Sequence, residues 1–524
     1  MLRPALVLLA PSLVLAAACG EPASSGPAPS APEPSAPAPQ PAPSTKPADL
    51  VIAAPADTPR PPFEFAPDDE AFLDEVQRSA FDFFWKAGDA FPPAGMAPDR
   101  TSKPTVSVAG VGFQLSALCI GAERGWVTRD QAAARAESIL RALAANPANR
   151  KGGLFYHFID PATAGQPTEA YEHVVSTIDS ALLFAGILTA SQYFGGPVRE
   201  LGDALFRDAD WTFFISDGED PLAKGYLSLG WKPDDIASPT GPGKLLPYAW
   251  IDSGDEHRLV TFLAVCAPEE ARRVDPALYY RLRRQLGAHG DTGPMVWFPW
   301  SGALFTNFFA HCWIDYAGMG PDTPRAFGIP NRSSVDWWEN SRRAVRLHRL
   351  KAIENPKKVP TLGINAWGLT ASDVEGGYGV PGVFPEPFPM PGAIPQIDYP
   401  LYEPTDNYGD GTIAPYGAGS CVMFEPDAAI AALRHYRGLT ASDGSPLVWR
   451  DPASGGYGFL DAFNLGTGWV GSDYLAIDQG PLLLAIENAR SGLIWRIFHE
   501  HPFVKDGCAR LKLDPAHARR PTPP

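Results

Sequence analysis

The chain has 524 residues, with 43 Lys and Arg against 59 Asp and Glu and a formal net charge of −16 at pH 7. This acidic balance argues against a nucleic-acid-binding protein, whose surface needs clustered positive charge. Hydrophobic residues make up 45% of the chain and aromatic residues 11%, so there are enough apolar side chains for a large core.

The N-terminus predicts export. Residues 1–18 have the pattern of a signal peptide, because their apolar run is too short to cross a hydrocarbon layer of roughly 30 Å and ends in small side chains. Cys19 follows three alanines, as in a bacterial lipobox, and is expected to carry a lipid after cleavage. We therefore expect a membrane-anchored lipoprotein on the periplasmic face or the cell surface, with the lipid as its sole membrane contact. Secretion without an anchor is the alternative.

The composition changes after Cys19. Residues 19–61 are dominated by Pro, Ala and Ser, which bury too little apolar surface to fold, and they are predicted to form a disordered tether. No second linker of this kind follows, so residues 62–504 are predicted to form one domain and residues 505–524 a C-terminal tail. The five remaining cysteines are expected to be buried free thiols rather than a disulfide framework.

Apolar residues recur at helical spacing along the domain, and the alternation typical of strands is scarce. Thr128 and Gln131 form a capping box at the start of one helix. About twelve helices are predicted, near residues 72–84, 108–124, 128–143, 174–194, 198–215, 255–267, 276–287, 303–318, 333–354, 365–371, 426–437 and 479–499. Helices in such pairs predict an all-α fold, an (α/α)6 toroid. Long loops rich in Gly, Pro and aromatic residues, at 378–416 and 451–474, are expected to line a cleft on its active-site face.

Several catalytic and binding motifs are missing. The sequence contains no GxSxG, Walker-type glycine loop, HExxH or CxxC pair, so it lacks the residues of a nucleophile elbow, a nucleotide site or a zinc site. The segment 406–417 departs from a calcium loop at its third and twelfth positions. No cofactor and no metal are therefore predicted.

Acids and aromatic residues occur together in short blocks, a composition suited to sugar chemistry. Glycosidic cleavage needs one carboxylic acid to protonate the leaving oxygen and one carboxylate to activate water or attack the sugar, and aromatic faces pack against sugar rings. The blocks are residues 107–113, 121–126, 155–160, 176–183, 313–316, 339–341, 367–373, 410–413, 457–464 and 477–481. This ordered series resembles the glycoamylase-like family, which includes bacterial endo-β-1,2-glucanases and a domain of cyclic β-1,2-glucan synthases.

The resemblance implies an (α/α)6 toroid with a cleft on one face and an inverting mechanism that uses two carboxylates. Glu256 matches the family's general acid, and Asp461, in the 457–464 block, is the best match for its base. A helix N-terminus would favour ionised Glu256, whereas crowding by Asp252 and Asp255 and burial would raise its pKa, so the acid role requires the second effect to win. The alternatives are a helix-start carboxylate at Glu256 and an Asx turn at Asp461.

Further acids and tryptophans are predicted to bind substrate through hydrogen bonds to sugar hydroxyls and through ring stacking. They are Asp179, Trp313, Asp315, Trp367, Asp373, Asp410, Trp469 and Asp478, with Trp297 and Trp300 as further aromatic candidates. Asp179, Asp373, Asp410 and Asp478 also compete with Asp461 for a catalytic role.

The sequence therefore predicts a monomeric, extracytoplasmic glycoside hydrolase that takes a poly- or oligosaccharide and cleaves a glucan internally. The resemblance makes β-1,2-glucan the expected substrate. Thr306, Asn307 and Ala317 differ from residues frequent in the family, so other functions stay open. One is hydrolysis or transglycosylation of an α-glucan or another polysaccharide on the same fold. Another is a surface glycan-binding lipoprotein without catalysis.

Overall fold

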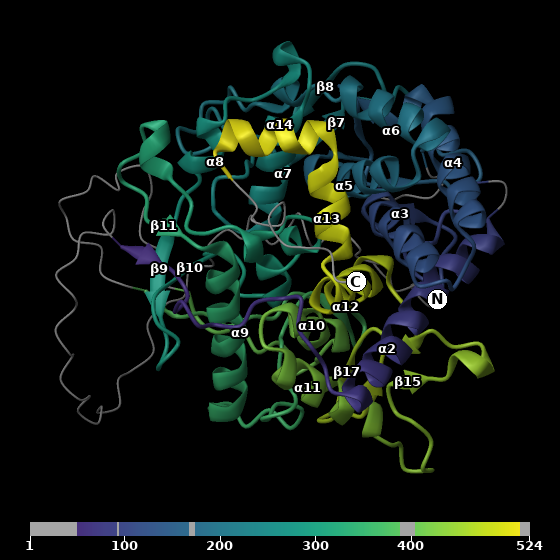
Figure 1. The fold of residues 1–524 in the computed structure, drawn as a ribbon, viewed down its shortest axis with the longest axis vertical. Coiled ribbons are helices and arrows are strands. Elements are labelled where there is room, and N and C mark those ends of the chain that lie inside the picture. Colours follow the sequence, from purple (N-terminus) through teal and green to yellow (C-terminus); the bar gives the residue numbers. More distant parts are fainter. Residues whose placement is uncertain (1–49, 92–93, 167–172, 388–403, 514–524) are drawn as a thin grey trace, which may run out of the picture.

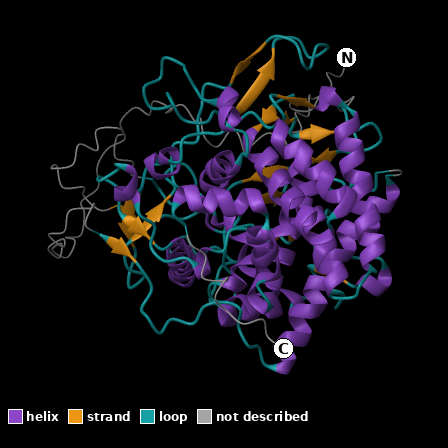
Figure 2. Cartoon of the chain, turned by 45° about the horizontal axis from the view of Figure 1, so that its top comes forward, coloured by secondary structure: helices purple, strands orange, loops and turns teal. Residues whose placement is uncertain are grey.

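The computed structural model describes residues 50–91, 94–166, 173–387 and 404–513. The predicted signal peptide, Cys19 and residues 20–49 of the tether lie outside the described residues. Within these ranges the chain is mostly helical, with thirteen α-helices packed together (Figure 1) and short strands in the loops between them (Figure 2). None of these helices is long and apolar enough to cross a membrane.

Six chain segments pack side by side around the centre of the domain. In chain order they are α3 (Val108–Glu123), α5 (Thr177–Phe194), α7 (Asp255–Cys266), the 3-10 turns η6 and η7 (Leu304–Asn307 and Ala310–Cys312), α10 (Pro415–Gly419) with η10 (Ser420–Met423), and α12 (Ala476–Arg490). Neighbours in this order contact each other, and α12 packs on α3. Between the 3-10 turns and α10 the contact includes the rings of Phe308 and Tyr416, 5.9 Å apart. Each of these segments therefore contacts the next one in the chain, and the last contacts the first.

The other helices alternate with the inner segments along the chain. They are α2 (Pro67–Lys86), α4 (Arg129–Ala145), α6 (Gly196–Asp208), α8 (Ala277–Arg281), α9 (Trp337–Glu354), α11 (Pro426–Gly438), α13 (Leu493–Glu500) and α14 (Pro502–Leu511). α2, α4, α6, α9 and α11 each bury one face and expose the other, which is the pattern of helices on the outside of a core.

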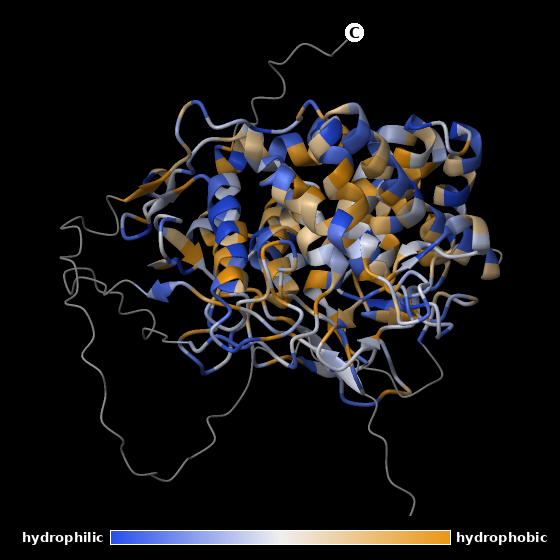
Figure 3. Cartoon of the chain, turned by 90° about the horizontal axis from the view of Figure 1, so that it is seen from below, coloured by the Kyte–Doolittle hydropathy of each residue, from blue (hydrophilic) through white to orange (hydrophobic). Residues whose placement is uncertain are grey.

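Strands of two to four residues occupy the connecting loops. They are β1 (Val51–Ile52), β2 (Val106–Ser107), β3 (Arg150–Lys151), β4 (Leu154–Phe155), β5 (Phe158–Ile159), β6 (Val175–Ser176), β7 (Gly230–Pro233), β8 (Gly243–Leu245), β9 (Gln285–Ala288), β10 (Met295–Trp297), β11 (Ser334–Val335), β12 (Ser372–Val374), β13 (Gly377–Gly379), β14 (Glu386–Pro387), β15 (Trp449–Arg450), β16 (Gly458–Phe459), β17 (Phe463–Asn464) and β18 (Trp469–Val470). They form two three-stranded sheets, β6-β7-β8 and β10-β9-β14, and several pairs. Figure 3 shows many of the loops gathered on one side of the helical body.

Helices α3 and α5 form a closely packed pair. Nearly every residue of both is buried, because their sequences are apolar on all sides, and Ser107 and Ser176 cap their N-termini. Gly112 and Gly186 leave no room for a side chain where the helices meet. A Cβ on Gly112 would lie 2.2 Å from the carbonyl oxygen of Leu182, and one on Gly186 would lie 2.0 Å from the carbonyl oxygen of Gly112.

Most predicted helices are confirmed with shifted ends, and the capping box of Thr128 and Gln131 is present. Four segments differ. The segment 479–499, predicted as one helix, is divided between α12 and α13. Residues 303–318 form separate 3-10 turns that include η8 (Tyr316–Gly318), residues 276–287 contain only the short α8 before β9, and residues 365–371 contain no helix. Apolar residues at helical spacing do not distinguish a buried irregular segment from a buried helix, so tertiary packing decides.

The folded domain is longer than predicted at both ends. β1 pairs in parallel with β11, and Arg60 donates hydrogen bonds to Asp336 and to the carbonyl oxygen of Ala317. Residues 50–61 therefore lie against the domain instead of belonging to the tether. At the other end α14 extends beyond the predicted boundary at residue 504. The five cysteines after Cys19 are buried free thiols, as predicted.

Candidate active site

The candidate site lies at the N-terminal ends of the inner helices. Ser107 and Ala109 come from the start of α3, Asp179 from the first turn of α5, Glu256 from that of α7 and Asp478 from that of α12, and all line one cavity. This cavity, called the inner pocket below, holds about 780 Å³ of space that is partly open to solvent. Side chains that are far apart in the sequence therefore converge on it.

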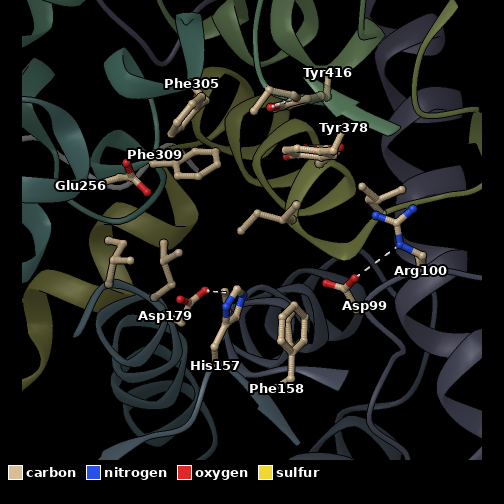
Figure 4. A pocket seen from close by; sticks show the side chains of 18 residues that line it. Asp99, Arg100, His157, Phe158, Asp179, Glu256, Phe305, Phe309, Tyr378 and Tyr416 are labelled. Carbon is tan, nitrogen blue, oxygen red and sulfur yellow. Dashed lines mark hydrogen bonds and ion pairs between the residues drawn. The ribbon is translucent and has the colours of Figure 1, made fainter. Parts of the chain in front are cut away.

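Glu256 is the second residue of α7 and is only 5% exposed. The preceding Asp255 fixes the start of the helix, since its carboxylate pairs with Arg258 and accepts a hydrogen bond from the Ala310 N–H (3.0 Å). The Arg258 guanidinium in turn lies over the Trp337 ring, 3.7 Å from its centroid. These buried contacts hold α7 against η7 and present Glu256 to the inner pocket (Figure 4).

The pKa of Glu256 is raised to about 8, first by burial and then by the carboxylates of Asp179 and Asp255. The helix N-terminus acts in the opposite direction, but its typical contribution of about 0.3–1 kcal/mol corresponds to less than one pKa unit. Burial and like charge therefore win the competition anticipated from the sequence. Glu256 carries a proton at neutral pH, as a general acid must.

Aromatic rings form much of the wall of the inner pocket (Figure 4). Phe305 and Phe309 lie on the same side of the cavity as Glu256, and Asp179 faces them with its Oδ1 atom 3.4 Å from Nε2 of His157. The other aromatic lining residues are Phe158, Tyr378 and Tyr416. Apolar ring faces interrupted by a few acids suit a sugar, whose ring faces are apolar and whose edge carries hydroxyls.

A second cavity, called the aromatic pocket below, adjoins the first. Glu256 and Phe305 line both cavities, and the second holds about 1030 Å³ of space. Its aromatic side chains are Tyr248, Trp250, Phe298 and Trp300. Trp300, a predicted aromatic candidate, is 41% exposed there. Glu256 thus stands where two cavities meet.

Arg100 joins three loops on another wall of the inner pocket. One terminal nitrogen of its guanidinium lies 3.1 Å from both carboxylate oxygens of Asp373, and the group lies 3.6 Å from Asp473 and 3.7 Å from Asp99. The Asp373 N–H donates a hydrogen bond to Oδ2 of Asp461 (2.8 Å). Burial and the charge of Asp461 raise the pKa of Asp373 to about 6 despite the guanidinium.

Asp461 and Asp478 lie together next to these loops. Asp461 is 2% exposed and Asp478 1% exposed, and their carboxyl groups are within hydrogen-bond reach of each other. Burial raises the pKa of both, and the neighbouring Asp461 moves the pKa of Asp478 well above its usual range. Asp478 lines the inner pocket, whereas Asp461 is not among its lining residues. The predicted base therefore lies behind the pocket wall.

The predicted substrate-binding acids on the inner pocket or next to it are Asp179, Asp478 and, through Arg100, Asp373. Trp313 and Trp367 are instead fully buried in the core, and the Trp313 indole N–H donates to Oγ of Ser116 (2.9 Å). Trp297 is 7% exposed and packs against Phe384. These enclosed rings line neither pocket, in contrast to their prediction as sugar-stacking platforms.

Three other predicted residues also line neither pocket. Asp315 is fully buried and accepts a hydrogen bond from the Gly318 N–H in a 3-10 turn, and Asp410 accepts one from the Thr412 N–H (2.9 Å). Trp469 lies in β18 and packs against the core. Both acids cap turns of the backbone, a role common for short polar side chains.

Sequence reasoning missed some of the pocket. Arg100 carries no motif, and its role depends on an acid 273 positions away. His157 belongs to one of the family-like blocks, and Tyr378 opens an aromatic loop predicted to line a cleft, so both had a sequence signal. In the part of the chain that the structure describes, no group of three or more His, Cys, Asp or Glu side chains is placed to hold a metal ion.

Known proteins resemble this chain over most of its length. The Glycoamylase family model, described as "Putative glucoamylase", matches residues 247–502. A curated relative, the exo beta-1,2-glucooligosaccharide sophorohydrolase (non-reducing end) of Parabacteroides distasonis, is 27% identical over 480 residues, or 85% of this chain. The chain spans 58% of that relative's length.

Solved structures share the fold. A crystal structure of a "putative glucoamylase" from Bacteroides uniformis aligns with a TM-score of 0.66 and 27% identity, covering 86% of this chain and 98% of that one. The endo-beta-1,2-glucanase of Chitinophaga pinensis, in complex with sophorotriose and glucose, aligns with a TM-score of 0.67 and 23% identity, covering 86% and 99%. The resemblance predicted from the sequence is confirmed, and the segment that matches the Glycoamylase family model, residues 247–502, holds Glu256, Asp461 and Asp478.

Proposed function

We propose that the chain is a glycoside hydrolase that cleaves β-1,2-glucan. The observation that carries this proposal is Glu256, a buried carboxyl that holds a proton at neutral pH at the meeting point of two aromatic-lined cavities. Such a group can protonate a glycosidic oxygen whose two sugar units occupy the two cavities. The name of the Parabacteroides distasonis relative, which states action on β-1,2-glucooligosaccharides, supports the linkage.

The proposed mechanism inverts the anomeric carbon. Glu256 protonates the leaving oxygen while a water molecule attacks from the opposite face of the sugar, and an aspartate takes a proton from that water. Asp461 is the proposed base. Burial raises its pKa, but the hydrogen bonds from Asp478 and from the Asp373 N–H favour its carboxylate form.

Cleavage inside the glucan chain is the proposed mode, because cavities lie on both sides of Glu256. The name of the curated relative favours a second candidate, release of the disaccharide sophorose from the non-reducing end. The size of the first products released from long linear β-1,2-glucan distinguishes internal cleavage from release of sophorose. A range of oligosaccharides supports internal cleavage, and sophorose alone supports the exo mode.

The general-acid assignment is tested by Glu256→Gln, which keeps the size of the side chain but removes its proton donor. We expect reducing-sugar release from β-1,2-glucan by purified residues 50–513 to fall by about 10²- to 10⁴-fold. Asp217→Asn, at an exposed position outside both pockets, is the matched control and should keep full activity. Equal turnover by the Glu256→Gln protein would contradict the acid role. Binding of the glucan without any product from the unsubstituted protein would favour a non-catalytic glycan-binding role.

We infer that the helices form an (α/α)6 toroid. The support is the order of contacts, in which six inner segments close a ring and an outer helix lies between consecutive inner segments. Pocket residues lie at the start of α3, α5, α7, α10 and α12, so these helices run in the same direction and the intervening helices return the chain. At one inner position the 3-10 turns η6 and η7 replace a helix.

We also propose that the protein is exported and anchored to a membrane through Cys19 after removal of residues 1–18. The sequence pattern supports this proposal. Cys19→Ala should abolish incorporation of a labelled fatty acid and release the protein from the membrane fraction. Continued labelling of the Cys19→Ala protein would contradict the assignment.

A further inference from the structure

Asp478 lies between the proposed base and the cavity that would hold the substrate. It is in the first turn of α12, is 1% exposed and lines the inner pocket. Asp461 is 2% exposed and is not among the lining residues. A water molecule in the inner pocket therefore meets Asp478 rather than Asp461.

Three of the four carboxyl oxygens in this pair lack a hydrogen-bond donor outside the pair. Oδ2 of Asp461 accepts from the Asp373 N–H at 2.8 Å, but Oδ1 of Asp461 and both oxygens of Asp478 are buried and accept no hydrogen bond of normal geometry from another described side chain or N–H. The Tyr416 hydroxyl lies beside Asp478 but donates to the carbonyl oxygen of Ala371 (2.8 Å). Two adjacent buried carboxylates would repel each other and stay unsatisfied, whereas one proton between them supplies the missing donor.

The surrounding charges favour one shared proton. Arg100 is engaged by Asp373 and lies near Asp473, and in the described part of the chain it forms no ion pair with Asp461 or Asp478. The groups that face the pair are Arg100, Asp373, Asp473, Tyr378 and Tyr416. The Asp373 N–H donates to Asp461 and no N–H of the described residues donates to Asp478, so the negative charge is favoured on Asp461 and the proton on Asp478. The pKa of Asp478, raised by burial and by the charge of Asp461, points in the same direction.

We propose that Asp478 is a catalytic relay, which takes the proton of the attacking water on one oxygen and passes its own carboxyl proton to Asp461. This proposal rests on the proposed function. As the water oxygen bonds to the anomeric carbon, the glycosidic C–O bond breaks and the leaving oxygen takes the proton of Glu256. Asp478 gains one proton and loses one, and Asp461 becomes neutral. Exchange with solvent after product release returns a proton to Glu256 and restores the Asp461 carboxylate.

Asp478→Asn tests the relay, because an amide still donates to Asp461 but does not pass a proton on. We expect kcat on β-1,2-glucan to fall by at least about 100-fold with KM nearly unchanged. Azide attacks without losing a proton, so added azide should restore turnover and give a glucosyl azide of inverted configuration, detected by mass spectrometry. Azide should not restore the Glu256→Gln protein, which cannot protonate the leaving oxygen. Asp506→Asn, an exposed change on α14, is the matched control.

Wild-type turnover in Asp478→Asn, or a loss that azide does not restore, would overturn the relay and leave the proposed function standing. No sugar release by the unsubstituted protein would overturn the proposed function and the relay with it. A second test of the shared proton uses the Glu256→Gln protein, so it does not depend on whether the Asp478→Asn protein folds. Its infrared spectrum at pH 7 should keep the C=O band of a buried neutral carboxylic acid, and absence of that band would overturn the shared proton.

Discussion

At the scale of single residues, burial determines the protonation of the site. Glu256 lies at a helix N-terminus, where a carboxylate is usually stabilised, yet its pKa is raised to about 8 because the side chain is enclosed and has negative neighbours. The described residues form no ion pair with it, in contrast to Asp255 one position earlier, which pairs with Arg258. Two adjacent acids in one helical turn thus have different environments.

The pH dependence of kcat/KM should reflect the raised pKa of Glu256. Because the proposed acid role requires a protonated Glu256, kcat/KM should fall as the pH rises through about 8. Asp179→Asn removes a negative charge that raises the Glu256 pKa, so the alkaline limb should move to lower pH, whatever happens to the maximum rate. Measurement of kcat/KM across the pH range checks this, with Asp217→Asn as the control. An alkaline limb that stays in place or moves upward would contradict the coupling.

The sequence predicted some of these residues because of its resemblance to the family. That resemblance assigned Glu256 and Asp461, and Glu256 lines both pockets. The sequence could not distinguish Trp313 and Trp367 from Trp300, because an indole ring suits a core and a sugar platform equally well. The partnership of Asp461 with Asp478 exists only once the loop before α12 folds back on that helix.

At the scale of elements, the crossing of α3 and α5 sets the position of two pocket-lining turns. Ser107 caps α3 and Asp179 lies in the first turn of α5, and both line the inner pocket. The helices approach closely because Gly112 and Gly186 place backbone against backbone. Any side chain at these glycines would separate the helices and shift one wall of the pocket.

Gly112→Ala should therefore destabilise the protein. The new Cβ would lie 2.2 Å from the Leu182 carbonyl oxygen, a backbone atom that cannot move without the helix, and we expect a loss of about 2–3 kcal/mol in the free energy of unfolding. Gly438→Ala, at the end of α11 where a Cβ would meet nothing within 4 Å, is the control and should be neutral or stabilising. Denaturant unfolding of the two variants measures the difference in stability. Equal unfolding midpoints would show that α3 and α5 can separate at little cost in free energy.

Features that depend on a few consecutive residues were the most predictable part of the fold. The capping box at Thr128 and Gln131 involves four consecutive residues, so the sequence alone specified it. The segment 303–318 was predicted as a helix because its apolar residues recur at helical spacing, but contacts from elsewhere, such as the hydrogen bond from the Ala310 N–H to Asp255, hold it as separate turns. Such contacts cannot be read from a local pattern.

At the scale of the whole molecule, residues 50–61 attach the N-terminal segment to the domain. Ile52 is fully buried in the β1–β11 pairing, and Arg60 bonds to the nearly buried Asp336. Pro and Ala of the tether continue on both sides of the short apolar run 50–52, so the boundary was predicted at residue 62. The recurrence of apolar residues at helical spacing, in contrast, was enough to predict a mostly helical domain.

A chain that starts at Pro62 should be less stable than one that starts at Leu50. It loses the burial of Ile52 and leaves Asp336 without Arg60, so we expect a deficit of roughly 3 kcal/mol. Guanidinium unfolding of residues 62–513 and 50–513 measures the difference. Identical unfolding midpoints would show that the segment rests on the domain without stabilising it.

The contacts of Arg100 have a consequence for local unfolding. One guanidinium binds acids from the loops around residues 99, 373 and 473, and Asp373 in turn donates its N–H to Asp461. None of these loops can open alone without leaving a buried acid uncompensated, so their amide hydrogens should exchange with solvent in a single cooperative step. The pocket wall would then be either complete or open along all three segments, with no stable state in which only one has come away.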